Sequence, residues 1–122
     1  MHTFLTAKQM IEQAKKTADT VDVAEFRNMR DKGALIIDVR EPGEWQEGHI
    51  EDAAAIPRGT LEMKITDAEA NQQRPIVTYC ASGGRAALAA ATLQSMGYTA
   101  AVASEAGFDD LQAAGLPCSE AD

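Results

Sequence analysis

Cysteine and histidine are scarce in this sequence, with two residues of each among 122. One cysteine lies mid-chain and the other close to the end, a pattern that is not typical of a disulfide framework. Two histidines without clustered cysteines do not indicate a metal site either. We therefore expect no metal and no disulfide, and a reducing cytoplasm is the simplest location.

Positive charge is also in short supply. The chain has 11 Lys and Arg against 19 Asp and Glu, a net charge of -8. No basic stripe interrupts this acidic average, so nucleic acid is not an expected partner. The same charge disfavours anionic membranes and gives no long-range attraction to an anionic substrate. Any anion site therefore has to act at short range, through local dipoles.

Long hydrophobic runs are missing. The longest apolar stretches, such as residues 34–37, span a few residues, and the first five residues show no basic segment followed by an apolar one. The sequence predicts no transmembrane helix and no signal peptide. With 45% apolar and 25% charged residues, the composition is that of a globular protein, and the length suits a single core.

Short apolar runs alternate with segments rich in small helix formers, which is typical of a parallel sheet covered by helices. Residues 34–39 and 75–79 are continuous apolar runs, as in strands that are buried on both faces. Shorter strands are predicted at residues 53–56 and 100–103. Predicted helices begin after the capping residues Thr6 and Asp22, the second ending at Gly33, and others cover residues 60–67, 85–96 and 108–114.

The chemistry is predicted at Cys80, which follows the second buried strand and precedes a tight turn and a helix. In parallel sheets the ligand crevice lies beyond the carboxyl ends of the strands. Backbone N–H groups of residues 81–84 can converge there, and the helix dipole adds to them, so that an anionic sulfur is stabilised. Ser82 offers a hydroxyl, Gly83 and Gly84 allow close approach of the backbone, and Arg85 can brace loop carbonyls or hold an anionic donor.

The alternative interpretation is that Cys80 is a small apolar residue at a strand end, because free cysteines are usually buried and inert. The Gly-Gly-Arg turn that leads directly into a helix favours the functional interpretation.

The segment Cys80-Ala-Ser-Gly-Gly-Arg85 resembles the six-residue active-site loop of the rhodanese family. Asp38-Val-Arg-Glu41, Glu44-Trp45, and Gly48-His-Ile50 with Ile56-Pro57 resemble that family's other signature stretches, in the same order. The resemblance spans about residues 20–117. It implies an α/β fold with a five-stranded, mainly parallel sheet that is flanked by helices on both faces.

The resemblance also implies a thiosulfate sulfurtransferase. A donor such as thiosulfate or another persulfide donor passes its outer sulfur to Cys80, and the Cys80 persulfide passes it to cyanide or a thiol acceptor. Cys80 is then the catalytic residue, and Ala81, Ser82, Gly83, Gly84 and Arg85 form the substrate-binding loop. No cofactor is implied, and a sulfur-relay protein is a possible partner.

Two alternatives stay open. Phosphatases with a cysteine nucleophile keep five residues between Cys and Arg, whereas four separate Cys80 from Arg85 here, which suits one sulfur atom better than a phosphate. The second alternative is a non-enzymatic module or sulfur carrier for a partner protein. The scarcity of cations in the loop makes a thiol-bound persulfide, a polysulfide or a partner protein a stronger candidate than thiosulfate for the physiological donor.

Asp38 and Arg40 are expected to form an ion pair behind the loop that fixes its shape. We expect His49 to be satisfied by the backbone and Trp45 to be a core or rim anchor. Asp52 replaces a frequent glycine of the family.

The predicted organisation is an N-terminal helical extension (residues 1–19), a rhodanese domain (residues 20–117) and a C-terminal tail (residues 118–122). The tail begins at Cys118, which we expect to be an incidental thiol rather than a resolving cysteine.

Overall fold

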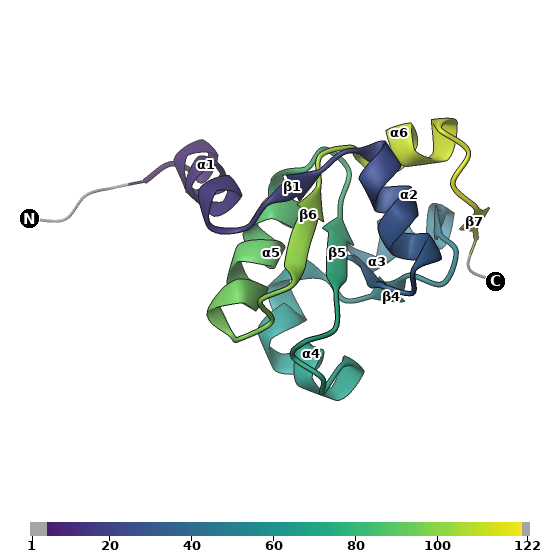
Figure 1. The fold of residues 1–122 in the computed structure, drawn as a ribbon. Coiled ribbons are helices and arrows are strands. Elements are labelled where there is room, and N and C mark those ends of the chain that lie inside the picture. The colour runs from purple at the N-terminus through teal and green to yellow at the C-terminus, as the bar shows by residue number, and fades with distance from the viewer. Residues whose placement is uncertain (1–4, 121–122) are drawn as a thin grey trace, which may run out of the picture.

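The computed structural model describes residues 5–120 of the chain. Five parallel strands form the main sheet, in the order β1-β6-β5-β2-β4. They are β1 (Thr20–Val21), β2 (Leu35–Asp38), β4 (Ala54–Ala55), β5 (Ile76–Tyr79) and β6 (Ala101–Ser104). Figure 1 shows β5 and β6 side by side in the middle of the molecule. The predicted parallel α/β sheet with helices on both faces is confirmed.

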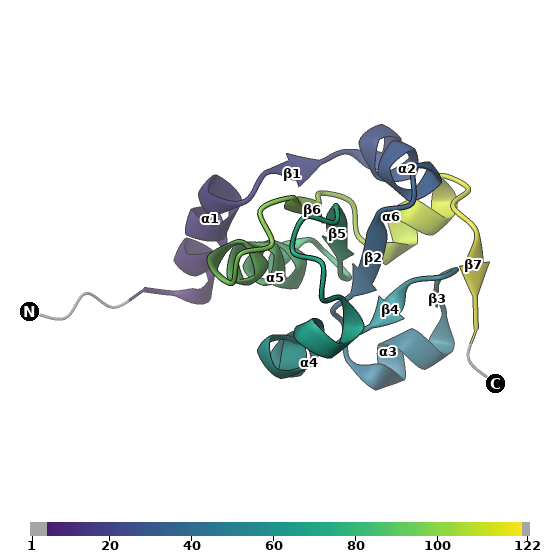
Figure 2. The ribbon, with the colours of Figure 1, turned by 60° about the horizontal axis from the view of Figure 1, so that its bottom comes forward.

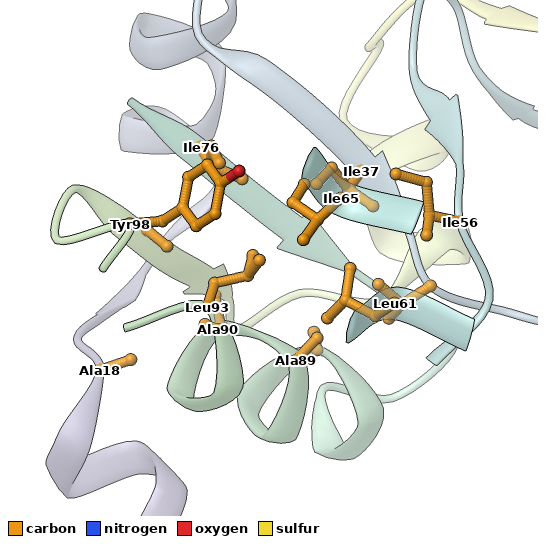
Figure 3. Close-up of a cluster of buried hydrophobic side chains, with 14 of the residues drawn as sticks. Ala18, Ile37, Ile56, Leu61, Ile65, Ile76, Ala89, Ala90, Leu93 and Tyr98 are labelled. Atoms are coloured by element: carbon orange, nitrogen blue, oxygen red, sulfur yellow. The ribbon is translucent and has the colours of Figure 1, made fainter. Parts of the chain in front are cut away.

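Helices α4 (Leu61–Ala68) and α5 (Gly84–Ser95) cover one face of the sheet. The core on this side contains the buried Ile37, Leu61 and Leu93, which point toward one another in Figure 3. The alanines of α5 bring it close to the sheet, since Ala86, Ala89 and Ala90 are fully buried and small side chains keep the backbones close. Helix α5, which begins in the loop that follows Cys80, is thus packed against the sheet along its buried face.

The other face is covered by α2 (Val23–Asp31) and α6 (Phe108–Ala113), as Figure 2 shows. Phe26, Tyr79 and Leu111 are buried there. The rings of Phe26 and Tyr79 meet edge to face with their centroids 6.2 Å apart, a favourable aromatic arrangement. Asp22 caps α2, because its side chain accepts from the N–H of Glu25, as the sequence predicted.

Helix α1 (Ala7–Thr17) lies along α5 (Figure 1). Its start has the predicted capping residue: Thr6 accepts from the N–H of Gln9, whose side chain accepts from the N–H of Thr6. Ala14 and Ala18 are buried against the domain. The N-terminal segment therefore packs on the domain in the part that the structure describes, whereas residues 1–4 of the predicted extension lie outside it.

The remaining elements are α3 (Pro42–Glu47), a 3-10 turn η1 (Arg58–Thr60) and two short strands, β3 (His49–Ile50) and β7 (Cys118–Ser119). β3 and β7 pair antiparallel in a separate two-stranded sheet. The predicted tail therefore pairs with the domain at residues 118 and 119, and its residues 121–122 lie outside the described chain. The division into extension, domain and tail stays a prediction. Within residues 5–120, no helix has the length and apolarity that crossing a membrane requires.

Candidate active site around Cys80

Cys80 lies between β5 and α5, at the carboxyl end of the central strand. Its Sγ accepts two backbone hydrogen bonds, from the N–H of Gly83 at 3.0 Å and from that of Ala86 at 3.4 Å. These donors belong to the tight turn and to the first turn of α5, where helical N–H groups have no partner within the helix. The geometry suits a sulfur that carries negative charge. Of the predicted donors in residues 81–84, Gly83 is the one that donates to the sulfur, and the second donor, Ala86, lies beyond that turn.

The side chain of Cys80 is nevertheless buried, with 1% of the residue exposed. The residue also belongs to the hydrophobic core on the α5 side of the sheet. The sulfur thus has apolar neighbours, as expected for a buried structural cysteine, and also the N–H donors that are expected for a functional one. Ala81 and Ser82, in contrast, are exposed.

Two glycines make the turn around Cys80 possible. Gly83 has a φ of +98°, and a Cβ on it would lie 3.3 Å from the carbonyl oxygen of Glu105. Gly107 approaches the loop even more closely, because a Cβ there would lie 1.8 Å from the carbonyl oxygen of Ala81. The N–H of Phe108 donates to the carbonyl of Cys80 at 2.9 Å. The connection from β6 to α6 thus supports the loop from outside.

Arg85 binds Glu44 of α3 in a bidentate pair, with distances of 2.8 and 3.1 Å. The Arg85 hydrogen bond is the main reason that the pKa of Glu44 falls from 4.5 to about 2, and it outweighs the opposing effect of burial. Glu44 raises the pKa of Arg85 in turn. The one cation of the loop is therefore neutralised by a carboxylate from another helix, a partner to which the sequence analysis assigned no role.

A hollow of about 340 Å³ opens beside the loop. Its walls come from α3, from the start of α6 and from the loop, and they are formed by Arg40, Glu44, Glu47, Gly48, Ala81, Phe108 and Asp109. Three of these side chains are carboxylates. The hollow reaches the loop at Ala81, but the buried Cys80 is not among the residues that line it.

Asp38 and Arg40 form the expected ion pair, with the shortest N–O distance at 2.7 Å. Both side chains are buried, at 1% and 6% exposure. The hydroxyl of Tyr79 donates to Asp38 at 2.7 Å and accepts from the N–H of Ile50 at 2.9 Å. Burial, followed by the charge of Asp38, raises the pKa of Tyr79. This network joins the ends of β2 and β5 to β3. The part of Tyr79 in it was not predicted, because the strand pattern of residues 75–79 does not indicate a partner for the Tyr79 hydroxyl.

His49 has the backbone partner that was expected for it. Its Nδ1 lies 2.9 Å from the carbonyl oxygen of Trp45, and the two rings stack with their centroids 3.4 Å apart. Trp45 packs at the edge of the core. This arrangement anchors α3 to β3.

Cys118 lies on β7 and is partly buried. Its thiol is 3.2 Å from the carbonyl oxygen of Leu116, and burial raises its pKa. Both cysteines are free. Within residues 5–120, no group of three metal-binding side chains is close enough together to hold an ion.

Comparison with known proteins gives a consistent result. The model of the family described as rhodanese-like domain matches residues 22–114. A putative mitochondrial thiosulfate sulfurtransferase from Schizosaccharomyces pombe is 38% identical over 79 residues, covering 56% of each chain. The thiosulfate sulfurtransferase GlpE of Pseudomonas syringae is 30% identical over 81 residues, covering 66% of this chain and 74% of its own.

The first curated relatives are longer than the chain. The probable adenylyltransferase/sulfurtransferase MoeZ of Mycobacterium tuberculosis is 37% identical over 92 residues, which cover 74% of this chain but 23% of MoeZ. The chain therefore spans from about a quarter to just over half of the length of these relatives.

Among solved structures, a polysulfide-sulfur transferase homodimer from Wolinella succinogenes matches with a TM-score of 0.79 and 27% identity, covering 93% of this chain and 86% of its own. A protein of unknown function from Rhodopseudomonas palustris, described as a possible tyrosine phosphatase, matches with a TM-score of 0.80 and 30% identity, covering 98% of this chain and 99% of its own.

Proposed function

The chain belongs to the rhodanese-like domain family, and from this membership and the loop geometry we propose that it transfers sulfane sulfur through a persulfide on Cys80. The observation that carries the proposal is the pair of N–H groups, from Gly83 and Ala86, that point at the Cys80 sulfur. Such donors stabilise an anionic sulfur, and the thiolate is the nucleophilic form of cysteine.

The proposed reaction has two displacements. The Cys80 thiolate attacks the outer sulfur of thiosulfate, an S–S bond forms to Cys80, and the bond to the inner sulfur breaks as sulfite leaves with the electron pair. An acceptor then attacks the terminal sulfur of the persulfide. Cyanide gives thiocyanate and a thiolate gives a new persulfide, and in both cases the Cys80 thiolate is regenerated. Neither step requires an external oxidant, a metal or a cofactor.

The physiological donor is better sought among persulfides and polysulfides than in thiosulfate. Arg85 is the single formal cation of the loop, and both of its contacts with protein carboxylate go to Glu44. The neighbouring hollow adds Glu47 and Asp109. A dianion gains little in such surroundings, whereas a donor whose sulfur is attached to an uncharged or cationic carrier has less repulsion to overcome.

We further propose that a sulfur-relay protein is the partner of this domain and that the protein works in the cytoplasm. Sulfurtransferase regions in longer relatives such as MoeZ support a role as one step of a relay. A reducing compartment fits the chemistry, because Cys80 has to be a thiol in order to accept sulfur.

A second candidate is a sulfur carrier or binding module that turns over poorly with small acceptors. The burial of Cys80, at 1% exposure, favours this candidate because it slows the access of a small acceptor to the sulfur. A phosphatase is disfavoured by the four-residue spacing between Cys80 and Arg85 and by the engagement of Arg85 with Glu44, since Arg85 is then not free to hold a phosphate.

The test is intact-mass analysis after incubation with thiosulfate, inorganic polysulfide and glutathione persulfide. We expect the mass of one added sulfur atom, with more complete loading from the two persulfide-type donors. Cys80→Ser abolishes the addition, whereas the matched control Cys118→Ser keeps it. Repeated turnover, measured as thiocyanate formed from donor and cyanide in large excess over the protein, distinguishes an enzyme from a carrier. Absence of loading from all three donors would refute the proposal.

A further inference from the structure

Helix α1 reaches the reactive loop at Ile11. A Cβ placed on Gly84 would lie 2.9 Å from Cδ1 and 3.7 Å from Cγ1 of Ile11. Ile11 therefore occupies the space that a side chain of residue 84 would fill. Gly84 is the first residue of α5 and a member of the loop, and α1 packs along that helix (Figure 2).

The position of Gly84 matters because this residue lies between the two residues whose N–H groups donate to the Cys80 sulfur. The N–H groups of Gly83 and Ala86 both point at Sγ of Cys80, and Gly84 lies in the chain between them. Glycine brings no side chain of its own to anchor this segment. Its φ is not in the left-handed region, so the backbone conformation does not require glycine here, and what occupies the space beside it is the end of the Ile11 side chain.

The N-terminal segment touches the loop region at a second point. The hydroxyl of Thr20 in β1 donates to the side chain of Glu105 at 2.9 Å. The carbonyl oxygen of Glu105 lies next to Gly83, 3.3 Å from where a Cβ would be. The segment from α1 to β1 thus supports the loop at consecutive glycines, directly at Gly84 and through Glu105 at Gly83. Residues 7–17 lie before the segment that matches the family model.

We propose that α1 is a working part of the reactive site, in which Ile11 is a positioning residue that supplies the side chain missing at position 84 and holds the start of α5 so that its N–H groups reach the Cys80 sulfur. The proposal relies on the proposed function only for the identity of the reactive sulfur. It concerns how that sulfur is activated, not what it transfers.

The experiment measures alkylation of both thiols in one sample by iodoacetamide, with peptide mass analysis, at fixed neutral pH. Ile11→Ala is compared with Met10→Ala, which removes a similar volume from the same helix at a side chain that is 49% exposed. We expect Ile11→Ala to slow alkylation of Cys80 about threefold relative to Cys118, equivalent to about 0.7 kcal/mol. Met10→Ala is expected to leave this ratio unchanged.

The direction of the change separates positioning from general destabilisation. Loosening of the fold exposes a buried thiol and speeds its alkylation, whereas misplaced N–H groups slow it. Adding Gly84→Ala to Ile11→Ala returns a methyl group to the vacated space and is expected to restore part of the Cys80 rate.

Two results would overturn the proposal. One is an Ile11→Ala protein that melts at a lower temperature but keeps the Cys80 to Cys118 ratio of Met10→Ala, or shows a higher one. The other is a double variant that is no faster at Cys80 than Ile11→Ala alone. Because no sulfur donor is involved, failure here is distinguishable from failure of persulfide loading.

Discussion

At the scale of single residues, Asp38 and Arg40 form the most deeply buried ion pair in the part of the chain that the structure describes. Its two side chains are almost fully enclosed, and Arg40 also donates to the carbonyl of Gly48 at 2.6 Å. The guanidinium lies 4.4 Å above the Phe108 ring centroid. Because both side chains are buried away from water, the charge of each is stabilised mainly by the opposite charge of the other.

Asp38→Asn is therefore expected to lower the free energy of unfolding by about 3 kcal/mol, because it leaves the Arg40 charge buried without a counter-ion. Urea unfolding followed by circular dichroism measures this change. Asp31→Asn, at a side chain that is 64% exposed, serves as the control and should change stability little. Similar midpoints for the two variants would contradict the argument.

Asp52 adopts a left-handed backbone, with a φ of +69°. This conformation costs an ordinary side chain about 1 kcal/mol or more. We expect Asp52→Gly to raise the free energy of unfolding by up to about 1 kcal/mol. The reverse change serves as the matched control: Gly33→Ala, at a φ of +88° with open space around the new methyl group, should lower the melting temperature. Lower melting temperatures for both variants would exclude backbone strain at Asp52.

The residues of the candidate site were predictable in part. The sequence predicted the Asp38–Arg40 ion pair and the place of Cys80 between a strand and a helix, and the structure has both, because a short spacing and a strand end determine these neighbours. The roles of Cys80 and its loop stay a prediction. The sequence did not pair Arg85 with Glu44, since a contact across 41 positions depends on how α3 packs. The approach of Gly107 to Ala81 was not predicted either, because it comes from the path of the chain between β6 and α6.

At the scale of elements, the Glu44–Arg85 pair ties α3 to the start of α5. The pKa of Glu44 is lowered to about 2, so its stabilising contribution is fully present above the usual pKa of a free glutamate. That contribution is lost as the pH falls toward 2. Both side chains are about one-third exposed, so solvent and salt screening keep the effect small.

We expect Glu44→Gln to change stability little at pH 7 but to remove part of the loss of stability between pH 4.5 and 2. Melting temperatures across this range measure the effect. The same substitution frees Arg85 for an anion, so the efficiency of loading with thiosulfate should rise about twofold or more, while Glu12→Gln on α1 changes neither. Unchanged thiosulfate loading would show that Arg85 stays unavailable for other reasons.

The longer elements followed from local pattern, as did the two-residue β4 within the predicted strand at residues 53–56, whereas β1, β3 and β7 did not. Apolar runs predicted β2 and β5 to within a residue or two, and capping residues predicted the starts of α1 and α2. β1, β3 and β7 have two residues each, too few to show any periodicity. Their pairing depends on long-range packing: β1 lies next to β6, and β7 returns to β3 from the far end of the chain.

At the scale of the whole molecule, the net charge of -8 should be visible in kinetics. Thiosulfate is a dianion and is repelled by this charge, and salt screens the repulsion beyond about 10 Å at 0.1 M. We expect the second-order rate of Cys80 loading by thiosulfate to rise about twofold between 20 and 200 mM of an inert salt. Loading by an uncharged organic trisulfide is the control and should stay constant. A fall with salt for thiosulfate would show that a local positive field dominates.

The two outermost strands of the main sheet, β1 and β4, each contain two residues. An edge strand can pair with a strand from a second molecule, and it does so more readily when more of its N–H and C=O groups are unpaired in a row. Edge strands of two residues offer very few such groups. Within residues 5–120, we therefore expect neither edge of the main sheet to support the addition of a strand from a second molecule.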